Sequence, residues 1–187
     1  MFTYSQSKNE ILRKILISVF AVISAIALPQ ICHYIGVLTG TGANLGAMLL
    51  PMHIPVMLCG LVCGAEYGLT LGLLLPFLRS FLFSMPPMYP NAVWMALELA
   101  TYGLVLGLLN KNSKSIPKLY LSLIIAMISG RIVWGIAKTL LLSGTSNAFT
   151  ISAFITGGVI DAIPGIVLQL ILIPLIMRII YRNGVKK

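Results

Sequence analysis

The feature that most constrains this chain is a series of long apolar segments, each close to the length that a helix needs to cross a lipid bilayer, about 20 residues. Six segments qualify: 15–35, 47–65, 67–83, 91–109, 119–142 and 153–180. A backbone in hydrocarbon must satisfy its hydrogen bonds internally, as a helix does. The sequence therefore predicts an all-α integral membrane protein, a compact bundle of six transmembrane helices forming one membrane domain over residues 1–187.

The basic residues predict how this bundle is oriented. Ten of the 13 lysines and arginines lie before the first segment, between the fourth and fifth, or at and after the end of the last: Lys8, Arg13, Lys14, Lys111, Lys114, Lys118, Arg178, Arg182, Lys186 and Lys187. Cationic loops are retained in the cytoplasm, so both termini are predicted to be cytoplasmic. Arg13 and Lys14 followed by an apolar run to Ala27 also fit a cleaved signal peptide. The run continues beyond Ala27, which favours a retained span.

Several classes of protein are disfavoured by what the sequence contains. The chain is 58% hydrophobic, and its basic residues flank apolar runs, so nucleic-acid binding is not expected. Cys32, Cys59 and Cys63 lack zinc-site spacing, and no metal or cofactor is predicted. There is no phosphate-binding loop, zinc-protease motif or nucleophile-elbow motif. We therefore expect no enzymatic activity, and ATP-driven energy would have to come from partners.

Ionisable residues inside the predicted spans are the main functional signal. They are His53, Arg79, Glu98, Arg131, Lys138 and Asp161. Each charge costs about 2.5 to 3.5 kcal/mol on insertion scales if it faces lipid, so these groups are expected to face one another or water. By their distance from the span ends they converge in the outer half of the bilayer. This arrangement favours a polar cavity open to the outside.

Helical spacing indicates which faces line that cavity. Asn91, Trp94, Glu98 and Tyr102 share one face of the fourth span, and Arg131, Trp134 and Lys138 share one face of the fifth. The predicted substrate-binding residues are His53, Arg79, Asn91, Trp94, Glu98, Arg131, Trp134, Lys138 and Asp161. The surplus of cations favours a ligand with a carboxylate or phosphate. Alternatively, Arg131 with Glu98 or Arg79 with Asp161 are structural pairs, His53 satisfies a proline-freed carbonyl, and the tryptophans anchor at the interface.

Several motifs resemble the S components, or substrate-binding subunits, of energy-coupling factor (ECF) transporters. Ala21-Val22-Ile23-Ser24-Ala25 matches an A-x-x-x-A pattern, in which two small residues let another helix approach closely. The segment 50–109 is similar to a subgroup of these S components, with Pro51-Met52-His53-Ile54-Pro55, Leu78-Arg79-Ser80, Met85-Pro86-Pro87 and Glu98-Leu99-Ala100-Thr101-Tyr102-Gly103. The resemblance implies docking through Ala21 and Ala25 on a transmembrane coupling (T) subunit, which works with two ATP-binding subunits.

The resemblance also implies a function and a location. The expected function is capture of a vitamin or related micronutrient from outside a prokaryotic plasma membrane, with toppling of the loaded subunit in the lipid. Pantothenate is the favoured substrate because its carboxylate needs a cation; a pyridoxine-like compound or a queuosine precursor suits the indoles equally. The alternative function is a proton-coupled secondary transporter that uses Glu98 or Asp161, although no inverted repeat is evident. A structural scaffold would leave the buried charges unexplained.

Overall fold

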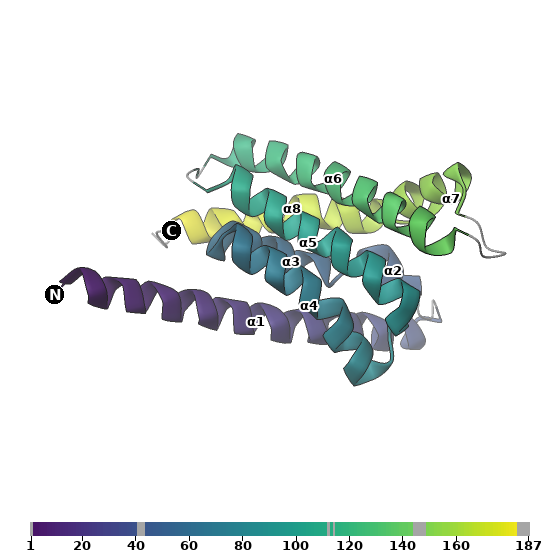
Figure 1. Ribbon diagram of the computed structural model, residues 1–187, viewed down its shortest axis with the longest axis horizontal. Helices are drawn as coiled ribbons and strands as arrows, with labels where there is room; N and C mark the ends of the chain where they lie inside the picture. The colour runs from purple at the N-terminus through teal and green to yellow at the C-terminus, as the bar shows by residue number, and fades with distance from the viewer. Residues whose placement is uncertain (1, 41–43, 112, 114, 144–148, 183–187) are drawn as a thin grey trace.

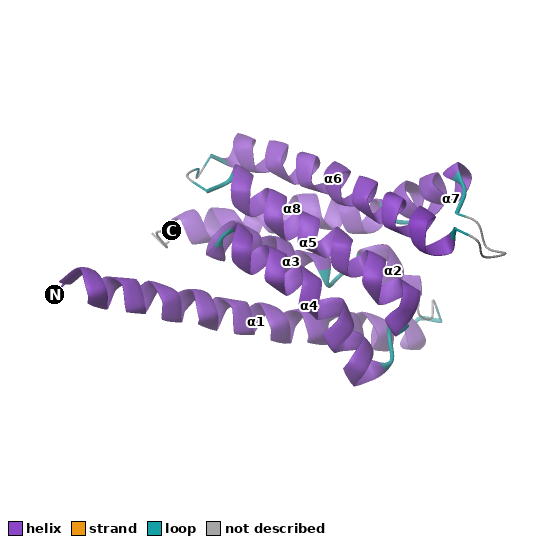
Figure 2. Cartoon of the chain, viewed as in Figure 1, coloured by secondary structure: helices purple, strands orange, loops and turns teal. Residues whose placement is uncertain are grey.

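The computed structural model describes residues 2–40, 44–111, 113, 115–143 and 149–182, and this part of the chain is helical with no strand. Figures 1 and 2 show long, roughly antiparallel helices joined by short connections. The elements are α1 (Phe2–Leu38), α2 (Asn44–Leu49), α3 (His53–Cys63), α4 (Ala65–Phe83), η1 (Met88–Ala92), α5 (Val93–Leu109), α6 (Ile116–Leu142), α7 (Ile151–Ile155), η2 (Thr156–Ile160) and α8 (Ile163–Arg182).

Five described helical segments are long and apolar enough to cross a membrane: Lys8–Leu38, Ala65–Phe83, Met88–Leu109, Ile116–Leu142 and Ile151–Arg182. The apolar helix α3 is shorter. The predicted all-α, multi-span class is therefore confirmed, whereas the count of six spans stays a prediction. The start of α1 and the end of α8 lie at the same end of the bundle (Figure 1). Their cytoplasmic placement also stays a prediction.

Proline and glycine interrupt two of the predicted continuous spans. The segment 47–65 is divided at Leu50, whose φ of 48° is left-handed, because the residue before a proline is disfavoured in the right-handed helical region. His53 then starts α3. The segment 153–180 contains a wide turn, closed by a hydrogen bond of 2.9 Å from Asp161 N to Thr156 O, before α8 begins. Both interruptions lie at the end of the bundle opposite the chain termini.

The centre of the bundle is held together by close backbone contact between α4 and α5. A Cβ atom placed on Gly103 would collide with the backbone of Gly68, and one on Gly107 would collide with Ala65. Small residues at such contacts allow helices in a membrane to approach closely. Helix α5 also packs on α3 and α6, so most of its surface is in contact with protein, although Leu97 and Leu108 are exposed.

Helix α1 lies at the edge of the bundle and packs chiefly on α3. Its inner face contributes Ala21 and Ala25 to the core, and Ser18 Oγ lies 3.6 Å from Cys59 Sγ of α3. Its other faces expose large apolar side chains, including Leu16, Phe20 and Ile23. An exposed apolar surface of this extent suits a helix in contact with lipid.

Candidate functional site

Glu98 on α5 is the centre of a buried polar cluster. Its side chain is 2% exposed, and its Oε1 atom accepts a hydrogen bond from Tyr102 Oη at 2.9 Å. The same oxygen forms a salt bridge with Arg131 Nη1 on α6, at 3.0 Å. His53 Nε2, at the start of α3, lies 3.6 Å from the same oxygen. The cluster thus joins three helices around one carboxylate.

Local sequence explains why these groups meet. Glu98 and Tyr102 are one turn apart on α5, so their side chains are neighbours. Gly130 on α6 has no side chain, and a Cβ there would collide with the Tyr102 ring. The ring therefore lies against the α6 backbone, which brings Arg131 within reach of Glu98. The His53 and Tyr102 rings are 5.3 Å apart, which places α3 against the same cluster.

Lys138 lies among aromatic rings two turns further along α6 than Arg131. Its Nζ is 4.6 Å from the ring centroid of Trp134, 4.7 Å from that of Trp94 and 5.0 Å from that of Phe149. Each contact is within cation–π range. Arg131 also approaches the Trp134 ring, with its guanidinium carbon 5.7 Å from the centroid. Both cations therefore contact the Trp134 ring. The rings of Trp94, Trp134 and Phe149 together form an aromatic wall.

Arg131 has donors that the described protein atoms do not use. Its Nη1 bonds to Glu98, whereas Nε and Nη2 are buried and have no hydrogen-bond partner. The His53 ring nitrogens are also buried without a hydrogen bond. A guanidinium presents its donors as a rigid fork that matches a carboxylate or phosphate. Chemically, this arrangement can bind an anion while the rings contact an apolar part of the same molecule.

The remaining predicted site residues lie outside this cluster. Asn91 is half-buried in η1, Arg79 is half-buried on α4, and Asp161 is exposed at the turn before α8. Within the described part of the chain, neither Arg79 nor Asp161 forms a salt bridge. No group of three potential metal-ligating side chains occurs among the residues searched. The structure thus brings together His53, Trp94, Glu98, Arg131, Trp134 and Lys138 from the predicted set.

The predicted docking residues face inward in this structure. Ala21 is 6% exposed and Ala25 is fully buried, and both belong to the core that α1 shares with α3. Their four-residue spacing therefore allows α1 to approach its own bundle closely. Their contact with a partner stays a prediction.

Sequence reasoning missed two aromatic members of the site. Phe149 and Phe154 pack on Trp134, with ring centroids at 5.4 and 5.9 Å. Gly135 of α6 makes room for Phe154, as a Cβ there would collide with its ring. Phe149 lies in a connection, where helical periodicity gives no signal. The glycines at 130 and 135 were the available clue, because both sit on the face of α6 that carries Arg131 and Trp134.

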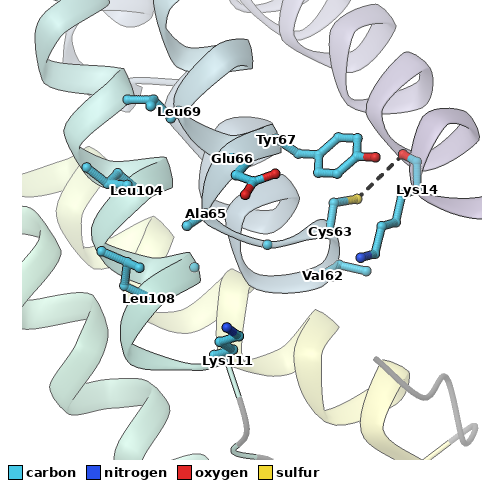
Figure 3. Close-up of a pocket in the computed structure, with 12 residues that line it drawn as sticks. Lys14, Val62, Cys63, Ala65, Glu66, Tyr67, Leu69, Leu104, Leu108 and Lys111 are labelled. Carbon is cyan, nitrogen blue, oxygen red and sulfur yellow. Dashed lines mark hydrogen bonds between the residues drawn. The ribbon is translucent and has the colours of Figure 1, made fainter. Parts of the chain in front are cut away.

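Two cavities lined by described residues lie away from this cluster. One of about 540 Å³ surrounds the turn between α3 and α4 and includes Lys14, Glu66, Tyr67 and Lys111 (Figure 3). The second, of about 420 Å³, is a groove between α1 and α4 that shares Glu66 and Tyr67 with the first. Both are nearer the end where the chain termini lie.

A family model for the substrate-specific component of ECF transporters matches residues 13–177. The chain belongs to this family. The match covers every segment that positions the Glu98 cluster and the aromatic wall. No curated protein and no solved structure matches the chain to a comparable standard.

Membership of the S component family defines what the chain does in general terms. Proteins of this family are the substrate-binding subunits of ECF transporters, and membership implies association with a transmembrane coupling subunit and ATP-binding subunits. The apolar helices of this chain agree with a multi-pass membrane protein. The self-sufficient secondary transporter is accordingly not favoured.

Proposed function

We propose that this S component captures an organic anion from outside a prokaryotic plasma membrane, in a site formed by Arg131, Lys138 and the aromatic rings beside them. The observation that carries the proposal is the pair of buried, unpartnered donors on Arg131. Leaving buried donors unsatisfied is unfavourable by about 1–3 kcal/mol or more. A ligand carboxylate that accepts from Nε and Nη2 removes this penalty.

Electrostatics gives the sign of the ligand. Glu98 neutralises one positive charge through Arg131, and Lys138 supplies a second cation close by. The cluster therefore has a surplus of positive charge when Glu98 is ionised, which favours an anion. The rings of Trp94, Trp134 and Phe149 provide apolar contact area for the rest of the molecule.

Pantothenate is the micronutrient that best fits these requirements. It has a carboxylate at one end, and an amide, hydroxyls and a branched apolar group along its length. A pyridoxine-like compound or a queuosine precursor would use the aromatic rings but would not bring the negative charge. The choice between them therefore depends on whether Arg131 is needed for binding.

Two substitutions with opposite effects on charge test the proposal. Glu98→Gln keeps the shape of the side chain and leaves Arg131 without its carboxylate, so an anion should bind as tightly as before or more tightly. Arg131→Gln removes the guanidinium group. The affinity for pantothenate should then fall by about 30-fold or more, since truncating a buried charge pair costs about 2–5 kcal/mol.

The measurement is calorimetric titration of pantothenate, and of pyridoxine in parallel, into detergent-purified protein. Ile132→Ala is a matched control, because Ile132 adjoins Arg131 but is exposed on α6. The double variant Glu98→Gln/Arg131→Gln removes the unpaired carboxylate that Arg131→Gln alone leaves buried. Undiminished affinity in this double variant would refute the role of Arg131. Loss of binding in Glu98→Gln alone would indicate a cationic ligand instead.

We also propose that Ala21 and Ala25 contact the coupling subunit in the assembled transporter. Because both side chains are buried against this chain's own core, α1 would first have to move relative to α3. A cysteine pair at Ser18 and Cys59, whose side chains are already in contact, offers a test. Oxidising Ser18→Cys to Cys59 should tether α1 and block association with the coupling subunit while ligand binding persists. Unchanged association would argue against this docking mode.

A further inference from the structure

The cavity between the start of α4 and the end of α5 has no role in the proposed capture of substrate. Its volume of about 540 Å³ is within the range of small-molecule sites, about 300–1,000 Å³. Figure 3 shows Lys14 on α1, Glu66 at the start of α4 and Lys111 after the end of α5 around the same turn. The lining is amphipathic, since Leu69, Leu104 and Leu108 complete it.

The cavity lies at the level where apolar helix gives way to polar sequence. Lys14 directly precedes the apolar part of α1, and Lys111 follows the last apolar turn of α5. Lysines at such positions reach the headgroup layer of a bilayer. The first turn of α4 also opens here, and it contains the acidic residue Glu66. Helix N-termini attract anions, whereas the carboxylate of Glu66 offsets part of the positive charge of the two lysines.

An apolar groove adjoins this cavity. It lies between α1 and α4, has a volume of about 420 Å³ and shares Glu66 and Tyr67 with the cavity. Its other lining residues are Ser18, Val22, Thr70, Leu71, Leu74, Leu75 and Leu78. A cavity with two lysines beside an apolar groove matches a phospholipid, with its charged head and its acyl chain.

We propose that this S component binds one anionic phospholipid with a hydroxyl-bearing headgroup at this place. Lys14 and Lys111 bind the phosphate, Glu66 accepts hydrogen bonds from headgroup hydroxyls, and one acyl chain occupies the groove between α1 and α4. The carboxylate of Glu66 makes a glycerol headgroup more suitable than a second phosphate, which it would repel.

Native mass spectrometry of the full chain with phosphatidylglycerol tests the headgroup site. Lys14→Gln/Lys111→Gln should weaken retention of phosphatidylglycerol about 25-fold, since each juxtamembrane lysine contributes about fivefold. Lys118→Gln/Arg178→Gln is a control with the same loss of charge at exposed positions of the same end, and it should weaken retention much less, because neither side chain lines the cavity. An equal loss in the two double variants would overturn the site, because it would indicate attraction by net charge alone.

The groove and the source of the phosphate are tested separately. Thr70→Trp places an indole in the groove and should release phosphatidylglycerol, whereas Ile124→Trp on the exposed face of α6 should not. If inorganic phosphate displaces the lipid at equal concentration, the cavity binds free phosphate and the proposal fails. Retention of phosphatidylcholine equal to that of phosphatidylglycerol would also overturn it.

Discussion

The two ends of the bundle hold their charges in different ways. At one end, Glu98 and Arg131 are paired at 3.0 Å among packed helices and rings. At the other, Lys14, Glu66 and Lys111 surround an open cavity, and none of the three has a salt bridge within the described residues. Charges removed from water interact strongly and in fixed geometry, whereas charges facing water remain screened and adaptable. The first arrangement suits recognition of one solute, and the second suits a membrane surface.

The largest expected effect separates the two ends directly. Arg131→Gln should lower affinity for the captured anion by about 2–5 kcal/mol and leave phosphatidylglycerol retention unchanged, because the lipid cavity lies at the opposite end. Lys14→Gln/Lys111→Gln should weaken retention of phosphatidylglycerol and leave the affinity for the captured anion unchanged. Both ligands are measured on the same preparations, by titration and by native mass spectrometry. Loss of both ligands in either variant would show that the ends are coupled.

A smaller effect is expected from the hydroxyl that supports Glu98. Tyr102→Phe removes a 2.9 Å hydrogen bond to a buried carboxylate, and hydrogen bonds to charged groups contribute about 1.5–3 kcal/mol. The variant should therefore melt at a lower temperature. Tyr120→Phe is the control, because Tyr120 is exposed on α6. Equal melting temperatures of the two variants would mean that the Tyr102 hydroxyl does not stabilise Glu98.

Packing at the cavity end should be sensitive to small changes of volume. Gly107→Leu places a side chain against the backbone of Ala65, and overpacking typically destabilises by about 1–3 kcal/mol. Gly46→Ala is the control, since a Cβ there meets no atom within 4 Å. Thermal unfolding in detergent measures both. If Gly107→Leu unfolds normally but loses the lipid, the close α4–α5 contact is needed only to shape the cavity.

The smallest effect should come from the cation among the rings. Lys138→Met keeps the length of the side chain and removes its charge, so cation–π contacts of about 0.5–2 kcal/mol are lost. Affinity for an anionic ligand should fall modestly, by less than for Arg131→Gln. Titration at low and high salt tests the electrostatic origin, since the defect should shrink with salt. A loss as large as that of Arg131→Gln would make Lys138 the principal anion contact.

The sequence by itself determined the class of the protein and much of its site. Apolar length predicted the helices of α1, α4, α5 and α6, because a helix in lipid needs that length whatever its neighbours are. Helical spacing placed Trp94 and Glu98 on one face and Arg131, Trp134 and Lys138 on another. The cost of burying charge indicated that these groups lie together, and the structure pairs Glu98 with Arg131.

Only the tertiary structure decided which side each helix turns toward its neighbours. Periodicity defines a face but not the rotation of that face within the bundle, which here follows from glycine contacts between α4 and α5. Ala21 and Ala25 therefore lie inside, and Asp161 is exposed after a wide turn in the last span. The cavity at Lys14 and Lys111 likewise arises where three separate segments end together, an arrangement that spacing along one helix does not encode.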